Sequence, residues 1–169
     1  MPSLSETIEQ KFSKFHSQKL VVLKILEYGL RVEKGRVLCN DIEVELRSLA
    51  KECKVDARAV KAAINNIESD KKLSRIFLNM KSTIHLGKVA PFLGMGEIVI
   101  EPYDARDYGI IYQTVEVLWR HKVSIRQAIG DDPDLVEDPK LYIITDSAIP
   151  ASIIPELKES SKIKGVTIY

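Results

Sequence analysis

Hydrophobic positions in the first half of the chain recur at the spacing of an α-helix. One apolar face predicts a helix over about 17–30, and a second predicts a helix over about 42–53. A third helix is predicted to start after Asp56, whose carboxylate suits an N-cap. The segment around Gly35 is predicted to be a loop. The predicted buried positions are Leu20, Val22, Leu23, Ile25, Leu26 and Leu30, then Ile42, Leu46, Leu49, Ala50 and Cys53, then Ala59, Val60, Ala63, Ile64 and Ile67.

The second and third predicted helices, joined by a turn at residues 54–56, resemble a helix-turn-helix. Arg58, Lys61 and Asn65 then face outward near the start of the third helix, where such motifs contact base edges or phosphates. We therefore expect these three residues to bind DNA. A three-helix bundle that binds nothing is the alternative, because exposed helix positions carry charge in any soluble protein.

Two short apolar runs after the third helix predict a β-hairpin. Ile76-Phe77-Leu78 and Ile84-His85-Leu86 flank polar residues that include Asn79, Lys81 and Ser82. This pattern predicts a two-stranded wing whose basic tip adds phosphate contacts. The first domain is accordingly predicted to be a mostly helical, winged helix-turn-helix domain over residues 1–88.

The hydrophobic pattern changes period after a segment rich in glycine. The sequence GKVAPFLGMG at 87–96 holds three Gly and one Pro, which predicts a linker over 89–96. Beyond it, short apolar runs and helical faces alternate in the order β-α-β-β-α-β. We expect a ferredoxin-like domain over 97–169, with both helices on one face of a four-stranded antiparallel sheet, and an α+β chain as a whole. The other sheet face is predicted to be apolar and uncovered, which favours dimerisation through the sheet face or edge.

The distribution of charge supports a division into two modules. Residues 1–88 hold 17 Lys and Arg against 11 Asp and Glu, a net charge of +6, and residues 89–169 hold 8 against 13, a net charge of −5. A positive module can bind nucleic acid, because Lys and Arg neutralise phosphates. No apolar run reaches the roughly 20 residues of a membrane span. We expect a cytoplasmic protein with no membrane partner.

The second domain resembles a known regulatory module. The segments IVIEPYDARDYGIIYQTVEVLWRHKVSIRQA and KLYIITDSAIPASIIPELKESSKIKGVTIY are similar to an ACT domain, the ferredoxin-like domain that binds amino acids. The whole chain also resembles prokaryotic predicted regulators of amino-acid metabolism that place a helix-turn-helix before such a domain. The resemblance implies an amino-acid effector, DNA as a second partner, and a homodimer or higher homo-oligomer.

The resemblance also implies an effector loop after the first strand of this domain. Gly109 occupies the family's glycine at the start of the first helix, where backbone N–H groups and the helix dipole favour a carboxylate. The family's usual Asp-x-Pro-Gly pattern is altered, because Arg106 stands at the acid and Tyr108 at the proline. The acids are displaced to Asp104 and Asp107, where either can meet an effector's ammonium group.

The second strand of the domain supplies one further effector contact. Ser124 stands where the family often has Asn. The resemblance therefore implies an effector site made of the loop at 104–109 together with Ser124. A domain used only for assembly, without a ligand, is the alternative.

Other chemistry has little support in the sequence. We expect no enzyme, since no nucleophile motif or phosphate-cradling loop is present, although ferredoxin-fold hydrolases carry an Arg where Arg106 stands. A scaffold whose helix-turn-helix docks a protein is a third possibility. We expect neither cofactor nor metal, and we interpret the acids at 131–138 as a solvated loop. The scattered histidines His16, His85 and His121, and the cysteines Cys39 and Cys53, show no metal-ligand spacing. Tyr112 and Trp119 are expected in a core or a dimer interface.

Overall fold

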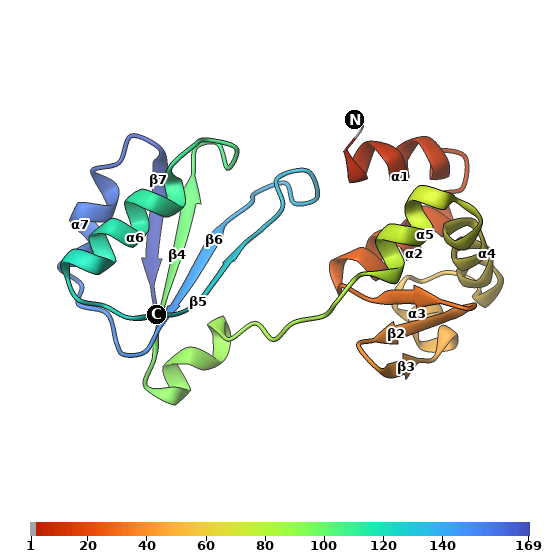
Figure 1. The fold of residues 1–169 in the computed structure, drawn as a ribbon, viewed down its shortest axis with the longest axis horizontal. Coiled ribbons are helices and arrows are strands. Elements are labelled where there is room, and N and C mark those ends of the chain that lie inside the picture. The colour runs from red at the N-terminus through yellow and green to blue at the C-terminus, as the bar shows by residue number, and fades with distance from the viewer. Residues whose placement is uncertain (1–2) are drawn as a thin grey trace. The chain divides into compact units, whose positions relative to one another are not determined.

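The computed structural model describes residues 3–169 as two compact units (Figure 1). The first ends at Ile84 and the second is His85–Tyr169. The chain is α+β, with a mostly helical first unit and a four-stranded sheet with helices in the second. The first unit contains α1 (Leu4–Phe12), α2 (His16–Glu27), β1 (Arg31–Glu33), β2 (Arg36–Cys39), β3 (Ile42–Val44), α3 (Leu46–Glu52), α4 (Ala57–Ser69) and α5 (Lys71–Leu78).

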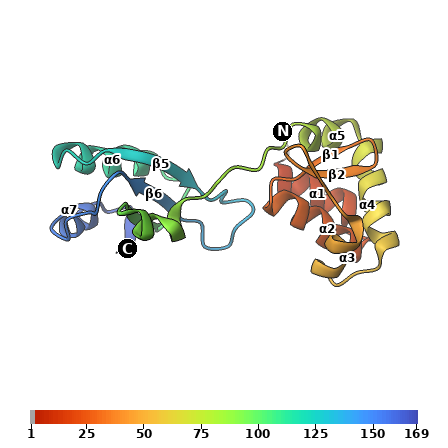
Figure 2. The same ribbon diagram turned by 90° about the horizontal axis from the view of Figure 1, so that it is seen from below.

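The helix-turn-helix pair is formed by α3 and α4, and Figure 2 shows the short turn between them. The start of α4 is as predicted, with the Asp56 carboxylate accepting a hydrogen bond from the Arg58 N–H at 2.7 Å. The predicted start of α3 was wrong. Residues 42–44 pair with β2 instead of continuing the helix, and Ile42 is 74% exposed rather than buried.

The segment predicted as a loop around Gly35 is part of a three-stranded antiparallel sheet, in the order β1-β2-β3. Lys34 and Gly35 both have positive φ, 51° and 74°, as a two-residue hairpin turn requires. The Gly35 N–H donates to Glu68 Oε1 at 2.8 Å, which ties this turn to the last part of α4. The small sheet therefore supports the helix-turn-helix from the opposite end of α4.

The predicted wing is absent, because residues 71–78 form α5. Leu73 and Phe77, four positions apart, are both fully buried in the core of the first unit. Asp70 caps this helix, accepting from the N–H groups of Lys72 and Leu73 at 3.0 and 3.1 Å. The local N-cap and the helical spacing of the buried residues override the short apolar run 76–78 that suggested a strand.

Asp70→Ala is expected to lower the free energy of unfolding by about 0.5–2 kcal/mol at pH 7, because it removes this cap. The N–H groups of Leu73 and Lys72, and the Lys11 ammonium, hold the pKa of the Asp70 carboxyl below its ordinary value of 3.8. Because the pKa of Asp70 is lower in the folded than in the unfolded state, its ionised carboxylate stabilises the folded state at pH values above the unfolded-state pKa. This stabilisation is lost as the pH falls through the folded-state pKa. Urea unfolding at pH 7 and at about pH 3 should show the difference between variant and wild type shrinking in acid.

The control for this prediction is Asp41→Ala, which removes an acid whose side chain is 100% exposed. It should leave stability nearly unchanged at both pH values. An Asp70→Ala difference that is absent at pH 7, or that is equal at the two pH values, would contradict the capping role.

The first helix, α1, was not predicted, although its start has a local signal. Ser3 Oγ accepts from the Glu6 N–H at 3.1 Å, and Glu6 Oε2 accepts from the Ser3 N–H at 2.8 Å. This reciprocal pair is a capping box. Ile8 and Phe12 then pack in the core of the first unit, so the polar appearance of the segment reflects its solvent face alone.

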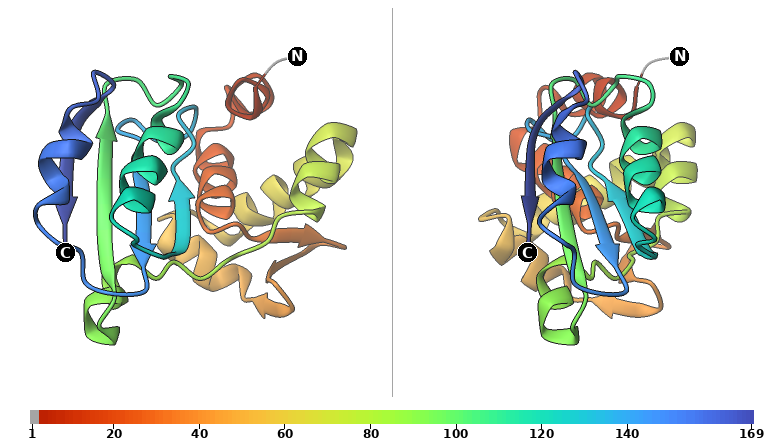
Figure 3. Two further views of the ribbon diagram at one scale, coloured as in Figure 1. Left: turned by 60° about the vertical axis from the view of Figure 1, so that its left-hand side comes forward. Right: turned by 90° about the vertical axis from the view of Figure 1, so that its left-hand side faces the viewer.

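The second unit has the predicted ferredoxin-like topology. Its four strands are antiparallel in the order β5-β6-β4-β7, and the left view of Figure 3 shows both helices in front of the sheet. Ile98, Ile100, Leu141 and Ile143 point to the helices and form the core with them. The elements are β4 (Gly96–Pro102), α6 (Ile110–Arg120), β5 (Ile125–Gly130), β6 (Leu141–Thr145), α7 (Ile153–Lys158) and β7 (Ile163–Ile168).

The opposite sheet face is covered over its central strands β4 and β6, contrary to the prediction of an uncovered apolar surface. Val99 and Ile144 lie on this face but are only 8% and 0% exposed. The segment before β4 covers them, with the 3₁₀ helix η1 (Gly87–Leu93) in contact with β4 and β6. His85 stacks edge-on against Tyr142 at 5.0 Å between ring centroids. The segment 89–96, predicted as a linker, thus belongs to the second unit, and the boundary lies at residues 84 and 85.

Candidate functional site

The turn of the helix-turn-helix is fixed by its backbone. Lys54 has a positive φ of 54°, and the Val55 N–H donates to the Ala50 carbonyl at 3.0 Å. These features define a Schellman motif, which ends α3 and redirects the chain into α4. The N–H of Arg58 and then its guanidinium hold the pKa of Asp56 below its usual value, so the cap is ionised at neutral pH. The start of α4 is therefore set locally.

Arg58, Lys61 and Asn65 are exposed along one face of α4. They follow one another at intervals of three and four residues, whereas Val60, Ala63, Ile64 and Ile67 are buried on the opposite side. Arg58 Nε donates to Asp56 Oδ1 at 3.2 Å, yet its side chain is 92% exposed. Exposed ion pairs of this kind are weak, so the guanidinium is free to exchange Asp56 for a phosphate.

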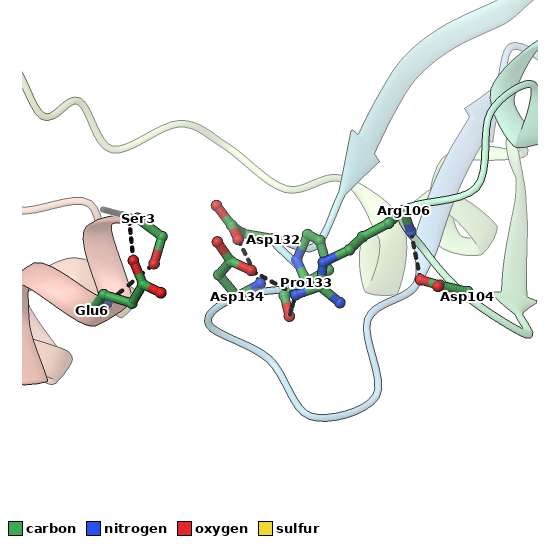
Figure 4. A network of polar contacts seen from close by, with 7 residues as sticks. All are labelled: Ser3, Glu6, Asp104, Arg106, Asp132, Pro133 and Asp134. Carbon is green, nitrogen blue, oxygen red and sulfur yellow. Dashed lines mark hydrogen bonds and ion pairs between the residues drawn. The ribbon is translucent and has the colours of Figure 1, made fainter. Parts of the chain in front are cut away.

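The predicted effector loop follows β4 and is held to the β5–β6 loop through Arg106 (Figure 4). Arg106 Nη2 donates to Asp134 Oδ1 at 2.6 Å and to the Pro133 carbonyl at 3.2 Å. Asp104 Oδ1 accepts from the Arg106 N–H at 2.9 Å. Asp104 and Arg106 therefore shape the loop, and the Arg106 guanidinium is already engaged by an acid.

A cavity of about 330 Å³ opens between these two loops. Glu101 and Lys140 line it, with Oε1 and Nζ 2.7 Å apart. This hydrogen bond lowers the pKa of Glu101 and raises that of Lys140. The cavity is highly charged, and both signs are represented. Its charged lining residues are Glu101, Asp104, Arg106, Glu137, Asp138, Lys140 and Lys164. Such a lining can hold a small zwitterion, which carries an ammonium and a carboxylate.

The other predicted effector residues lie apart from this cavity. Asp107, Tyr108 and Gly109 line a second, more apolar cavity of about 480 Å³ at the start of α6. Gly109 is the N-cap residue of α6 with φ 85°, and no side chain caps this helix end. The backbone N–H groups that the sequence analysis assigned to an effector carboxylate therefore have no side-chain acceptor within residues 3–169.

Ser124 lies at the opposite end of the sheet. It precedes β5, whose Ile125 pairs with Thr145, whereas the loop at 104–109 follows the other end of β4. Ser124 Oγ donates to Asp146 Oδ2 at 2.7 Å, and this bond, with one from Arg126, lowers the pKa of Asp146. The structure thus brings Asp104 and Arg106 together, places Asp107 to Gly109 beside them, and separates Ser124 from all five.

Three residues of the cavity were not predicted from the sequence: Glu101, Lys140 and Lys164. They come from three different strands or strand ends, and only the pairing of β4 with β6 and β7 brings them together. The sequence carries no signal that groups these three residues, and its acidic run at 131–138 indicates only that an acid was available for Arg106.

Metal chemistry finds no support in the part of the chain that the structure describes. No group of three or more His, Cys, Asp or Glu side chains in residues 3–169 is arranged to hold a metal ion. His121 Nε2 instead contacts Glu156 Oε1 at 2.5 Å, and His85 stacks on Tyr142. Among the same residues, no helix has the length and apolar character for a membrane span.

Comparison with known proteins gives only distant similarity. No family profile matches the chain, and no curated protein matches it. The transcriptional regulatory protein PF0864 from Pyrococcus furiosus, described as a member of the AsnC family, aligns over 100% of this chain and 88% of its own, with 11% identity and a TM-score of 0.30. A glycine-to-threonine mutant of Rv3291c aligns over 90% of this chain and 89% of its own, with 13% identity and a TM-score of 0.28. At TM-scores this low, neither protein defines a family for the chain.

Proposed function

We propose that this protein is a non-enzymatic, amino-acid-responsive regulator that binds DNA through its first unit. Its second unit acts as an ACT-like effector and dimerisation domain. The observation that carries the proposal is the exposed face of α4, where Arg58, Lys61 and Asn65 project from a helix-turn-helix with a fixed turn.

The chemistry of this face suits a DNA groove. Two cations can neutralise phosphates or donate to guanine, and an Asn amide can bond adenine. The net charge of +6 on residues 1–88 adds attraction to a polyanion. No wing follows α5, so any phosphate contacts outside the helix pair come from other parts of the unit. Lys34, which is 80% exposed at the β1–β2 turn, is one such cation.

The effector part of the proposal rests on the charged cavity between the loop at 103–106 and the β5–β6 loop. Its mixed charges complement a free amino acid, and the uncapped N-terminus of α6 lies on the same loop. Regulation then requires that the amino acid bind two arrangements of the dimer with different affinity.

The experiment that tests DNA binding is fluorescence anisotropy of a labelled duplex titrated with the full chain at several salt concentrations. We expect the logarithm of the binding constant to fall linearly with the logarithm of salt, because phosphate contacts release counterions. No binding even at low salt would refute the proposal. That outcome would favour the alternative of an assembly subunit whose helix pair docks a protein.

The structure does not favour the alternative of a hydrolase whose active site contains Arg106. Its guanidinium donates to Asp134 and to the Pro133 carbonyl, and the cavity that it lines carries four carboxylates, which repel an anionic phosphate ester.

A further inference from the structure

The outer face of α6 is an exposed row of large apolar side chains. Its members are 37% to 91% exposed. The spacing of those at 111, 112, 115 and 119 places them along one side of the helix, and Tyr108 precedes the N-cap residue Gly109. On the other side, Ile110, Thr114, Val117 and Leu118 are buried against the sheet. This row, the α6 stripe, consists of Tyr108, Ile111, Tyr112, Val115 and Trp119.

The α6 stripe has the composition of a protein interface. Tyr and Trp are enriched at the centres of such interfaces, whereas isolated exposed hydrophobic residues on a monomer need no partner. Covering one large aromatic side chain removes about 150–250 Å² from water, so the exposed parts of Tyr108, Tyr112 and Trp119 supply roughly 350–600 Å². This is about half or more of the ~800 Å² that each partner buries in a standard interface.

The sheet does not offer a comparable surface. On the sheet face opposite the helices, η1 contacts the central strands β4 and β6, where Val99 and Ile144 are buried. A dimer through that sheet face would therefore find little exposed apolar surface on the central strands, whereas the outer face of α6 exposes a row of large apolar side chains.

The charges at the two ends of the α6 stripe point to the partner. Asp107 precedes the helix and Lys122 follows it, and both are exposed. Within residues 3–169, neither side chain has an ion-pair or hydrogen-bond partner. A two-fold axis perpendicular to α6 makes the two helices antiparallel, so the acidic end of each copy meets the basic end of its partner. The two helix dipoles then also run in opposite directions, which is favourable. The surface is thus complementary to itself.

The spacing of the stripe suits the same arrangement. With Val115 on the two-fold axis, Ile111 of each copy lies level with Trp119 of the other. Val115 is the smallest member, and a small side chain at the crossing lets two helices approach to about 8–10 Å. The large aromatics flank this central contact on both sides.

We propose that two copies of this chain associate through the α6 stripe, with their α6 helices antiparallel about Val115. This inference deepens the dimer of the proposed function by naming its interface, and it is independent of DNA and of any amino acid.

Sedimentation velocity of the full chain, without DNA or amino acid, tests the interface. The wild type is expected to be a dimer at micromolar concentration. Tyr112→Ala/Trp119→Ala should raise the dimer dissociation constant about 100-fold or more, since each lost aromatic is lost twice in a two-fold interface. Both side chains are largely exposed, so the variant should retain the wild-type circular dichroism spectrum.

The matched control is Phe92→Ala/Leu93→Ala, which removes two side chains that are 89% and 59% exposed on η1 of the same unit. It should leave the dimer unchanged. A dimer that survives loss of Tyr112 and Trp119, or that is lost with Phe92 and Leu93, overturns the proposal.

A charge exchange tests the antiparallel orientation. Asp107→Lys should weaken the dimer about tenfold, because it places like charges together at both ends of the interface. Adding Lys122→Asp should restore association, and Asp tolerates the positive φ of 56° at this position. Failure of the second change to restore the dimer overturns the antiparallel arrangement.

Failure of this interface can be told apart from failure of the proposed function. A wild type that is monomeric at high concentration overturns the interface, and the α6 stripe is then covered by another part of the same chain or by a different protein. DNA binding in the anisotropy experiment would still be measurable for that monomer. Loss of DNA binding with an intact dimer overturns the DNA proposal alone.

Discussion

Arg58→Ala/Lys61→Ala is expected to bind duplex DNA roughly 10- to 100-fold more weakly than the wild type at about 0.1 M salt. The slope of log binding constant against log salt should also become shallower by about two, one for each lost phosphate contact. Both side chains are exposed on α4 and support no core residue, so folding should be unaffected. Fluorescence anisotropy at four or more salt concentrations measures affinity and slope together.

The control is Lys14→Ala/Lys81→Ala, which makes the same change in net charge at exposed positions outside α3 and α4. It should reduce the affinity for DNA only slightly, because it lowers the overall positive charge of the first unit without removing a residue from α4. If both double variants lose affinity equally, the first unit attracts DNA by net charge alone. If the α4 variant keeps the wild-type slope, Arg58 and Lys61 do not contact phosphates.

An amino-acid effector is expected to raise the free energy of unfolding by about 2.7 kcal/mol at a concentration of one hundred times its dissociation constant. Thermal unfolding against each common amino acid reveals such a ligand. Gly109→Val should abolish this response. Gly109 holds φ at 85°, a conformation that costs an L-residue about 1–2 kcal/mol, and a β-branched side chain will displace the start of α6.

Gly94→Val separates loss of the ligand site from backbone strain. Gly94 also has positive φ, 70°, and as at Gly109 nothing lies within 4 Å of an added Cβ. It should lower the melting temperature by a similar amount yet keep the response to the amino acid. A response that persists in Gly109→Val would move the effector site away from this loop. No response in the wild type to any amino acid would make the second unit an assembly domain.

The sequence predicted the second unit well because its elements are short, regular and bounded by turns. Each strand and helix of the β-α-β-β-α-β order has its own apolar pattern. The ferredoxin-like topology buries the apolar sides of these elements in a single core. The helix pair around Asp56 was predictable for the same reason, since the N-cap and the spacing of Val60, Ile64 and Ile67 lie within a few residues of one another.

The errors fall where pairing or packing between distant residues decides the structure. The β1-β2-β3 sheet exists because Ile42–Val44 pairs with β2, and an apolar spacing that also fits a helix could not show this. The run at 76–78 is short enough to suit a strand or a buried helix. Burial of Phe77 in a core built from α1, α2 and α4 decides in favour of the helix.

The candidate sites divide in the same way. By itself the sequence determined the exposed face of α4, because Arg58, Lys61 and Asn65 follow from helical periodicity once the N-cap is known. Only the tertiary structure decided that Arg106 is held by Asp134, that Ser124 lies at the far end of the sheet from Asp104, and that η1 packs on the central strands β4 and β6. Periodicity reports which side of one element is apolar. It cannot report which apolar side finds a partner, because that depends on strand order and on segments far away in the chain.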